Sequence, residues 1–147
     1  MKSKSPHFKQ LSILCLLIIL KINNSIAQPG KVFVNGITIA YESYGNKTDE
    51  SIILIQGTGA TMLHYPIELC ERLLANDFNV IRFDNRDVGL STHLDLLGQP
   101  DWAEIGPYIG TCNPAPLQYT LLDMAMDVIG LMDALKIKKA HIVGASM

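Results

Sequence analysis

A serine stands near the end of the sequence, in the segment Gly144-Ala145-Ser146-Met147, directly after the apolar run 140–143. A serine can attack a carbonyl carbon when it protrudes from a sharp turn between a strand and a helix. The spacing Gly-x-Ser is the first half of the motif Gly-x-Ser-x-Gly, whose last glycine would be residue 148. Gly-x-Ser alone is common, so its meaning depends on the segments that accompany it.

Two further segments carry residue types that suit a reaction site. In Gln56-Gly57-Thr58-Gly59, after the apolar run 52–55, glycines let the backbone approach a bound oxygen closely. The other segment has the spacing Asp-x-Arg-x-x-Gly-x-Ser and comprises Asp84, Arg86, Gly89 and Ser91. Each of the three segments follows a predicted strand, and the carboxyl ends of parallel strands form the ligand-binding edge of an α/β sheet. We therefore expect the three segments to meet.

Other interpretations of these residues are weaker. The pair Gly57-x-Gly59 resembles the start of a dinucleotide-binding fingerprint, but Met62 occupies the third glycine position. The strand before it would also be the third of the sheet, whereas the fingerprint follows the first strand of its unit. For Asp84 and Arg86 we expect a structural role, as an ion pair that braces a loop.

The histidines do not form a recognisable site. His141 lies inside a predicted strand, so we expect a hydrogen-bonded sheet residue there and not a general base. His64 lies in a predicted loop, where solvent contact is the simplest expectation. A metal site built from Asp87, His93 and Asp95 has no recognised ligand spacing, so the sequence predicts no metal.

The elements that must position these segments alternate along the chain. The stretch 31–45 predicts two strands joined at Asn35-Gly36, the dipeptide that favours a tight hairpin. The apolar runs IILIQG, FNVIRFD and KKAHIVG predict buried strands. The spacing in 65–75 predicts an amphipathic helix with a proline in its first turn, and four prolines make 92–118 a long irregular loop.

A second helix is predicted after that loop. Thr120 and Asp123 have the spacing of a capping box. The helix would carry one apolar stripe made of Leu121, Ala125, Val128, Met132 and Leu135. Two strands followed by strand–helix–strand–helix–strand predict an α/β fold with a mostly parallel sheet.

In this order the three segments resemble the α/β-hydrolase fold family, and most closely its proline-iminopeptidase and aclacinomycin-methylesterase-like subgroup. The resemblance runs from Gly30 onward and implies the N-terminal part of that fold, with a sheet that ends at the nucleophile elbow. It implies Ser146 as the nucleophile and the backbone N–H groups of Thr58 and Met147 as the oxyanion hole. Gly57, Gly59 and Gly144 would support these loops, Gly144 by removing a side chain that would collide. No cofactor is implied.

In this family the catalytic serine precedes its acid and its histidine in the chain. All four histidines (7, 64, 93 and 141) precede Ser146, so the acid and the base would lie beyond Met147. We therefore expect an inactive fragment of an exported serine hydrolase that cleaves a small-molecule ester or an N-terminal peptide bond.

Two alternatives remain, a non-catalytic exported binding module with this fold and a non-hydrolytic member such as a cofactor-free haloperoxidase or a lyase. A serine at the elbow argues against dehalogenases and epoxide hydrolases, which place an aspartate there.

The first residues predict a secretory signal peptide. Lysines at 2, 4 and 9 precede the apolar run 11–20, and a small-x-small ending predicts cleavage after Ala27. An uncleaved anchor is the alternative, but the run is about half the ~20 residues that a membrane-spanning helix needs. We expect a signal peptide at 1–27, a hydrolase portion at 28–147, a secreted or periplasmic location and no stable membrane span after cleavage.

Composition limits the partners. The net charge is −2, with 12 basic and 14 acidic residues spread along the chain, so no basic stripe for nucleic acid is visible. Cys70 and Cys112 could pair in an oxidising compartment or remain free thiols. The sequence leaves the oligomeric state open.

Overall fold

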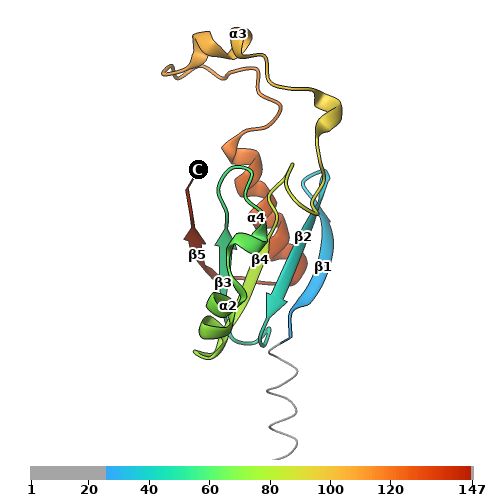
Figure 1. Ribbon diagram of the computed structural model, residues 1–147, viewed down its shortest axis with the longest axis vertical. Coiled ribbons are helices and arrows are strands. Elements are labelled where there is room, and N and C mark those ends of the chain that lie inside the picture. The colour runs from blue at the N-terminus through green and yellow to red at the C-terminus, as the bar shows by residue number, and fades with distance from the viewer. Residues whose placement is uncertain (1–25, 147) are drawn as a thin grey trace, which may run out of the picture.

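The computed structural model describes residues 26–146 and contains a five-stranded sheet with helices on both faces (Figure 1). The sheet order is β1-β2-β4-β3-β5, with β1 antiparallel to β2 and β2 antiparallel to β4. The strands are β1 (Gln28–Val34), β2 (Ile37–Tyr44), β3 (Glu50–Ile55), β4 (Phe78–Phe83) and β5 (Ala140–Gly144). Strands β4, β3 and β5 are parallel, so the predicted α/β class is confirmed, and the sheet as a whole is mixed, with two antiparallel and two parallel pairs.

The signal-peptide prediction concerns residues 1–27, of which only the last two are described, so it stays a prediction. Within residues 26–146, the helices are all too short or too polar to cross a bilayer.

The predicted hairpin is present between β1 and β2. Asn35 and Gly36 have φ values of 48° and 80°, the two positive values that a type I′ turn requires. The turn places Val34 opposite Ile37 and so sets the register of the whole pair. Local turn chemistry therefore determines how the antiparallel arm joins the sheet.

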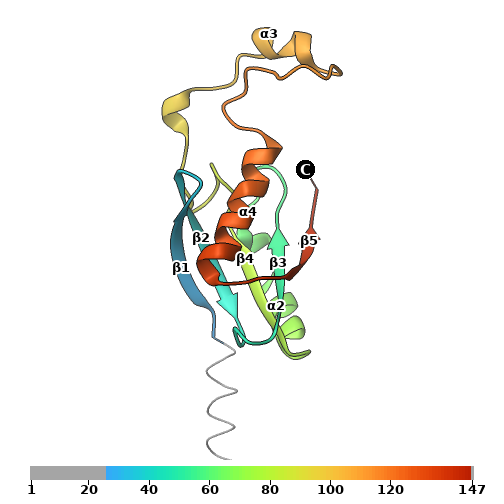
Figure 2. The ribbon, with the colours of Figure 1, turned by 180° about the vertical axis from the view of Figure 1, so that it is seen from behind.

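Helices α2 (Ile67–Leu74) and α4 (Leu121–Leu135) cover opposite faces of the sheet (Figures 1 and 2). Pro66 lies one position before α2, as its N-cap, where the missing N–H costs no helical hydrogen bond. The predicted capping box of α4 is confirmed. The Thr120 hydroxyl accepts the Asp123 N–H at 3.3 Å, and the Asp123 carboxylate accepts the Thr120 N–H at 2.7 Å.

The buried face of α4 differs from the predicted stripe. Val128 and Leu131 are buried, whereas Leu121 is 66% exposed. The first turn of α4 extends past the tips of the strands, so its side chains have no sheet beneath them (Figure 2). The prediction was correct for Val128 and in part for Met132 and Leu135, which are half-buried, but it was wrong for the exposed Leu121 and Ala125 and missed Leu131.

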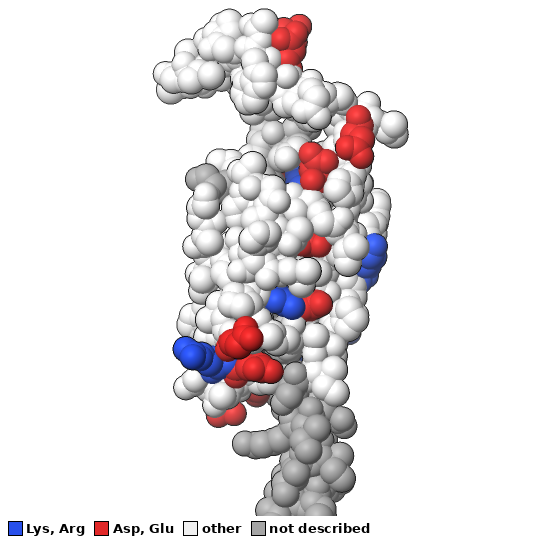
Figure 3. Space-filling model, in the orientation of Figure 1, with Lys and Arg blue, Asp and Glu red and all other residues white. Residues whose placement is uncertain are grey.

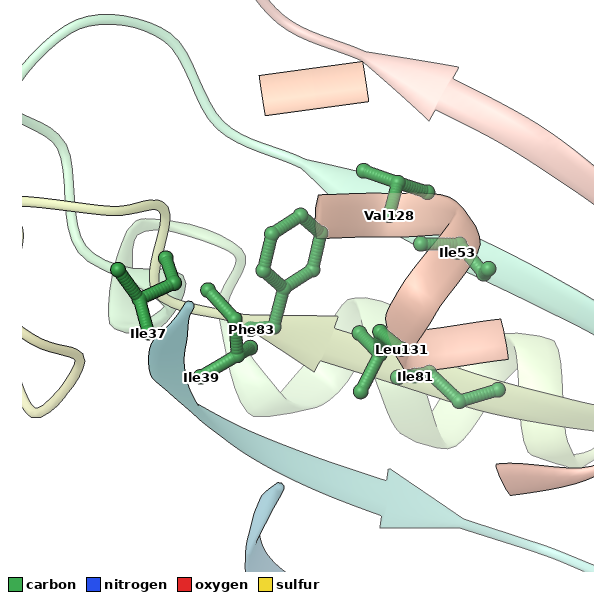
Figure 4. Close-up of a cluster of buried hydrophobic side chains, with 7 residues drawn as sticks. All are labelled: Ile37, Ile39, Ile53, Ile81, Phe83, Val128 and Leu131. Carbon is green, nitrogen blue, oxygen red and sulfur yellow. The ribbon is translucent and has the colours of Figure 1, made fainter. Parts of the chain in front are cut away.

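The core consists of two layers, one on each face of the sheet. Alternate strand residues point to opposite faces, so Ile53 packs toward α4 while its neighbour Leu54 packs toward α2. Figure 4 shows the layer beneath α4, which comprises Ile37, Ile39, Ile53, Ile81, Phe83, Val128 and Leu131. Burying each such side chain contributes about 1.5–3 kcal/mol, so this layer holds α4 on the sheet.

The segment 92–118 leaves the sheet and projects beyond its carboxyl edge (Figure 1). It was predicted to be irregular and contains only three short helical turns, Asp95–Leu97, α3 (Trp102–Ile105) and Gly106–Tyr108.

Among the described residues, the thiols of Cys70 and Cys112 are both free, with Cys70 buried and Cys112 exposed. On the face shown in Figure 3, Lys and Arg side chains form no continuous stripe.

Candidate functional site

The three segments singled out in the sequence lie at one edge of the sheet. Because β3, β4 and β5 are parallel, the residues after them emerge together at the carboxyl ends of the strands (Figure 1). Ser146 follows β5, is exposed and has a φ of 63°. A positive φ is uncommon outside glycine and marks a sharp, strained turn. The backbone at Ser146 therefore has the conformation expected of an elbow.

Gly57 makes the closest approach to Ser146. A Cβ placed on Gly57 would lie 2.8 Å from the Ala145 carbonyl oxygen, 2.8 Å from the Ser146 Cβ and 3.2 Å from its Oγ. Only a residue without a side chain fits there unless the turn shifts. Sequence reasoning placed Gly57 in the supporting loop, and the structure adds its direct contact with the serine.

The other supporting glycines behave differently. Gly59 has a φ of 71° and open space around it, which suits a turn after the loop. Within the described part of the chain, nothing lies within 4 Å of a Cβ placed on Gly144, so the collision expected at that glycine is absent there. The crowding falls on Gly57 instead. Thr58 is exposed beside Gly57, and Met147 lies outside the described residues, so the oxyanion-hole assignment stays a prediction.

The loop after β4 is fixed by Asp84. Its carboxylate accepts the N–H of Met62 at 2.7 Å and that of Leu90 at 2.8 Å. The Ser91 hydroxyl donates to the Asp84 carbonyl at 2.6 Å and accepts the Ala40 N–H at 2.9 Å. The prediction of an ion pair between Asp84 and Arg86 was wrong, because the carboxylate oxygens of Asp84 bind backbone N–H groups instead.

Arg86 pairs with Asp127 of α4 instead. Its Nε and Nη2 lie 2.7 Å from Asp127 Oδ2 and Oδ1, and the two side chains are 8% and 2% exposed. The hydrogen bond to Asp127 raises the pKa of Arg86, while burial opposes that shift. Sequence reasoning missed Asp127. The available signal was the position of this aspartate, one residue before Val128 and four before Leu131, on the face of the helix that is buried.

A cavity of about 220 Å³ lies between the loops and the start of α4. Its lining includes Gly57, Thr58, Arg86, Tyr119, Leu121 and Met124. The Arg86 guanidinium lies 5.4 Å from the centre of the Tyr119 ring, and Asn85 donates to the Gln56 carbonyl at 2.7 Å. The cavity is thus continuous with the loop that contacts Ser146, and apolar side chains form part of its wall.

None of the described histidines forms a hydrogen bond with Ser146. His141 Nε2 lies 3.2 Å from a Glu50 oxygen at the exposed end of the sheet, as expected of a sheet residue. The ligand atoms of Asp87, His93 and Asp95 lie within 4.8 Å of one another, a proximity that sequence spacing did not suggest. All three side chains are exposed, and His93 Nε2 lies 2.9 Å from the Gly89 carbonyl oxygen.

Strand order β1-β2-β4-β3-β5, helices on both faces and a sharp serine turn after β5 together define an α/β-hydrolase fold. The sequence is 30% identical over 111 residues to rhodomycin D methylesterase DauP from Streptomyces sp. (strain C5), across 76% of this chain and 31% of that protein. It is 28% identical over 120 residues to rhodomycin D methylesterase DnrP from Streptomyces peucetius, across 81% of this chain and 34% of that protein. No family model matches the sequence.

A solved structure supports the same conclusion. The enol-lactonase from Burkholderia xenovorans LB400 superposes with a TM-score of 0.57 and 27% identity, across 80% of this chain and 37% of that one. The predicted α/β-hydrolase fold is confirmed, and the chain has this fold. The chain spans about a third of the length of the curated relatives it matches.

Proposed function

We propose that this chain supplies the nucleophile and part of the oxyanion hole of a serine hydrolase that cleaves esters. The observation that carries the proposal is the exposed Ser146, held at a φ of 63° with the Gly57 backbone packed against it. DauP and DnrP, to which the chain is similar, are both methylesterases, which favours an ester over an N-terminal peptide bond. The finer subgroup and the serine chemistry are part of this proposal.

In the proposed reaction the Ser146 hydroxyl attacks the ester carbonyl carbon, and the carbonyl oxygen becomes an oxyanion. The N–H groups of Thr58 and Met147 donate to that oxygen, and losing one such donor typically costs ~3 kcal/mol in kcat. The serine proton passes to a histidine base located beyond residue 147, which protonates the leaving alcohol as the oxyanion collapses and the ester C–O bond breaks. Water then hydrolyses the acyl-serine, which releases the acid and restores the Ser146 hydroxyl. The cavity beside Gly57 receives an apolar part of the substrate, with Tyr119 as one wall.

The histidines within 26–146 do not supply that base. His64 contacts Thr61, His93 contacts the Gly89 carbonyl and His141 contacts Glu50. A serine without a base keeps its proton at neutral pH and is a poor nucleophile. We therefore expect the 147-residue chain alone to be inactive. We also propose that residues 1–27 direct export and are removed, which places the enzyme outside the cytoplasm.

The experiment begins with the DNA downstream of codon 147. If the reading frame continues, the extended protein is assayed with p-nitrophenyl esters and a fluorophosphonate probe, beside the 147-residue chain. We expect turnover and labelling at Ser146 in the extended protein and neither in the shorter chain. Ser146→Ala should abolish both, while the matched control Ser43→Ala, away from the site on β2, should retain them.

Each outcome decides between the alternatives. A downstream frame without a later acid and histidine, or an extended protein without ester turnover, contradicts the hydrolase and favours the binding module. Halide-dependent oxidation without ester cleavage favours the haloperoxidase. Stoichiometric labelling of Ser146 in the 147-residue chain would show that no downstream base is needed.

A further inference from the structure

The hydroxyl of Tyr65 lies where β3 and β5 end. It is 2.9 Å from the Ile55 carbonyl oxygen and 3.3 Å from the Val143 carbonyl oxygen. The side chain is buried, and burial raises the pKa of Tyr65, so the hydroxyl remains a donor at neutral pH. A phenol has one proton, so the two carbonyls share it, and Ile55 is the nearer acceptor.

These carbonyls directly precede the two halves of the candidate site. Ile55 is followed by the loop 56–59, and Val143 is followed by the segment that ends at Ser146. The Ile55 carbonyl also accepts the Ala145 N–H at 3.1 Å, so one oxygen binds both the tyrosine and the serine turn. Because Gly57 and Ser146 are already in close contact, a small change in strand register would alter their approach.

The backbone of Tyr65 is in turn held by a hydrogen bond from Arg82 of β4. The Arg82 guanidinium is almost fully buried and donates through Nη1 to the Tyr65 carbonyl. The Nε and Nη2 groups of Arg82 lie 2.8 Å and 2.6 Å from one Glu42 oxygen. These two bonds to a single carboxylate oxygen, together with the bond to Tyr65, hold the planar guanidinium in one orientation. A continuous set of hydrogen bonds therefore leads from β2, through β4 and Tyr65, to the strand ends that carry the site.

We propose that Tyr65 is a positioning residue that sets the approach of the loop 56–59 to Ser146. This inference rests on the proposed function, because it assigns Tyr65 a part in a reaction whose substrate it does not touch. Its hydroxyl binds the backbone of both strands, so it acts on their relative position and leaves the reacting groups unchanged. The side chains of 56–59 are not needed for this effect.

The test is amide hydrogen exchange, followed by NMR in the 147-residue chain carrying Tyr65→Phe. Loss of a hydrogen bond of ordinary strength should accelerate exchange at Ala145 by about tenfold. The amides of Ile53 and Ile81, in the core of the sheet, should change much less. Ser51→Ala is the matched control, because it removes a buried hydroxyl that accepts the Asn79 side-chain amide at 2.9 Å, at the opposite end of β3 from the site.

A uniform acceleration at all these amides would assign Tyr65 only a general role in stability and overturn the proposal. An unchanged rate at Ala145, or an equal effect of Ser51→Ala there, would also overturn it. Exchange requires no catalysis, so this result stands whether or not the serine hydrolase proposal succeeds. In an active extended protein, Tyr65→Phe should lower kcat and leave KM unchanged, since the ester never contacts Tyr65.

Discussion

Replacing Asp127 by alanine should destabilise the protein more than most single substitutions. Asp127 is 2% exposed and accepts two hydrogen bonds of 2.7 Å from Arg86. It also accepts one of 2.9 Å from the Asn35 side-chain amide. The alanine variant would leave a buried guanidinium without a counter-charge. Removing one partner of a buried pair costs about 3–5 kcal/mol, a large part of the ~5–15 kcal/mol that stabilises a typical domain.

The cost should come from the uncompensated charge and not from loss of attraction. The double substitution Arg86→Met with Asp127→Leu removes both charges and retains apolar volume, so it should cost much less than Asp127→Ala alone. Asp133→Ala provides the matched control, because Asp133 is an exposed carboxylate on the same helix. A surface change of this kind should stay within about 0.5 kcal/mol.

Urea unfolding followed by circular dichroism measures these differences, with the slope m compared among all variants. A loss below about 1 kcal/mol for Asp127→Ala would contradict the assignment of a buried, charge-dependent contact. A double variant as unstable as Asp127→Ala would locate the effect in packing. Equal slopes would exclude a change in the unfolded state as the cause.

Two further predictions concern titration and thiol reactivity. Burial alone would raise the pKa of Glu42, but hydrogen bonds from Tyr44 and Arg82 outweigh it and lower the pKa below 4.5. Above pH 4.5 the free energy of unfolding should therefore be about 2 kcal/mol higher with ionised Glu42 than in the Glu42→Gln variant, and this difference should disappear as the pH falls below 4.5. Urea unfolding of both proteins over a range of pH measures the difference. A difference that does not depend on pH would contradict the prediction. Cys112 is exposed and should react at once with a thiol reagent, whereas Cys70, buried and with its pKa raised by burial, should react only as the protein unfolds. Peptide mapping of the labelled thiols distinguishes them, and equal rates at the two sites would be inconsistent with the fold.

The elements of this fold were predictable because their signals are local. Asn35-Gly36 specifies a hairpin turn, and Thr120 with Asp123 specifies where α4 begins, each within a few residues. The continuous apolar runs marked β3 and β4 as strands covered on both faces. These elements gave the order of strands and helices along the chain. That order predicted that the candidate site lies at the carboxyl ends of the parallel strands.

The contacts that brace the site were not predictable in this way. Asp84 and Arg86 are neighbours in the sequence, which suggested a pair between them. In the fold, Asp84 binds the N–H groups of Met62 and Leu90, while Arg86 reaches Asp127, 41 positions along the chain. The choice between such partners depends on where α4 crosses the sheet, and no periodicity in the sequence specifies that. The position at which α4 crosses the sheet also determines which of its residues are buried, so the exposure of its first turn was not predictable either.

The strain at Ser146 is of a different kind from the strain elsewhere in the described chain. Five non-glycine residues have positive φ, namely Asn35, Asp77, Asp87, Lys136 and Ser146. Asparagine and aspartate adopt this conformation readily, and Lys136 ends α4 in the left-handed position that helix ends commonly use. Ser146 has neither reason, and such a conformation costs about 1–3 kcal/mol unless its surroundings impose it. The Gly57 contact and the bond from the Ala145 N–H to β3 supply that constraint, so the strain is maintained where the proposed reaction needs an exposed hydroxyl.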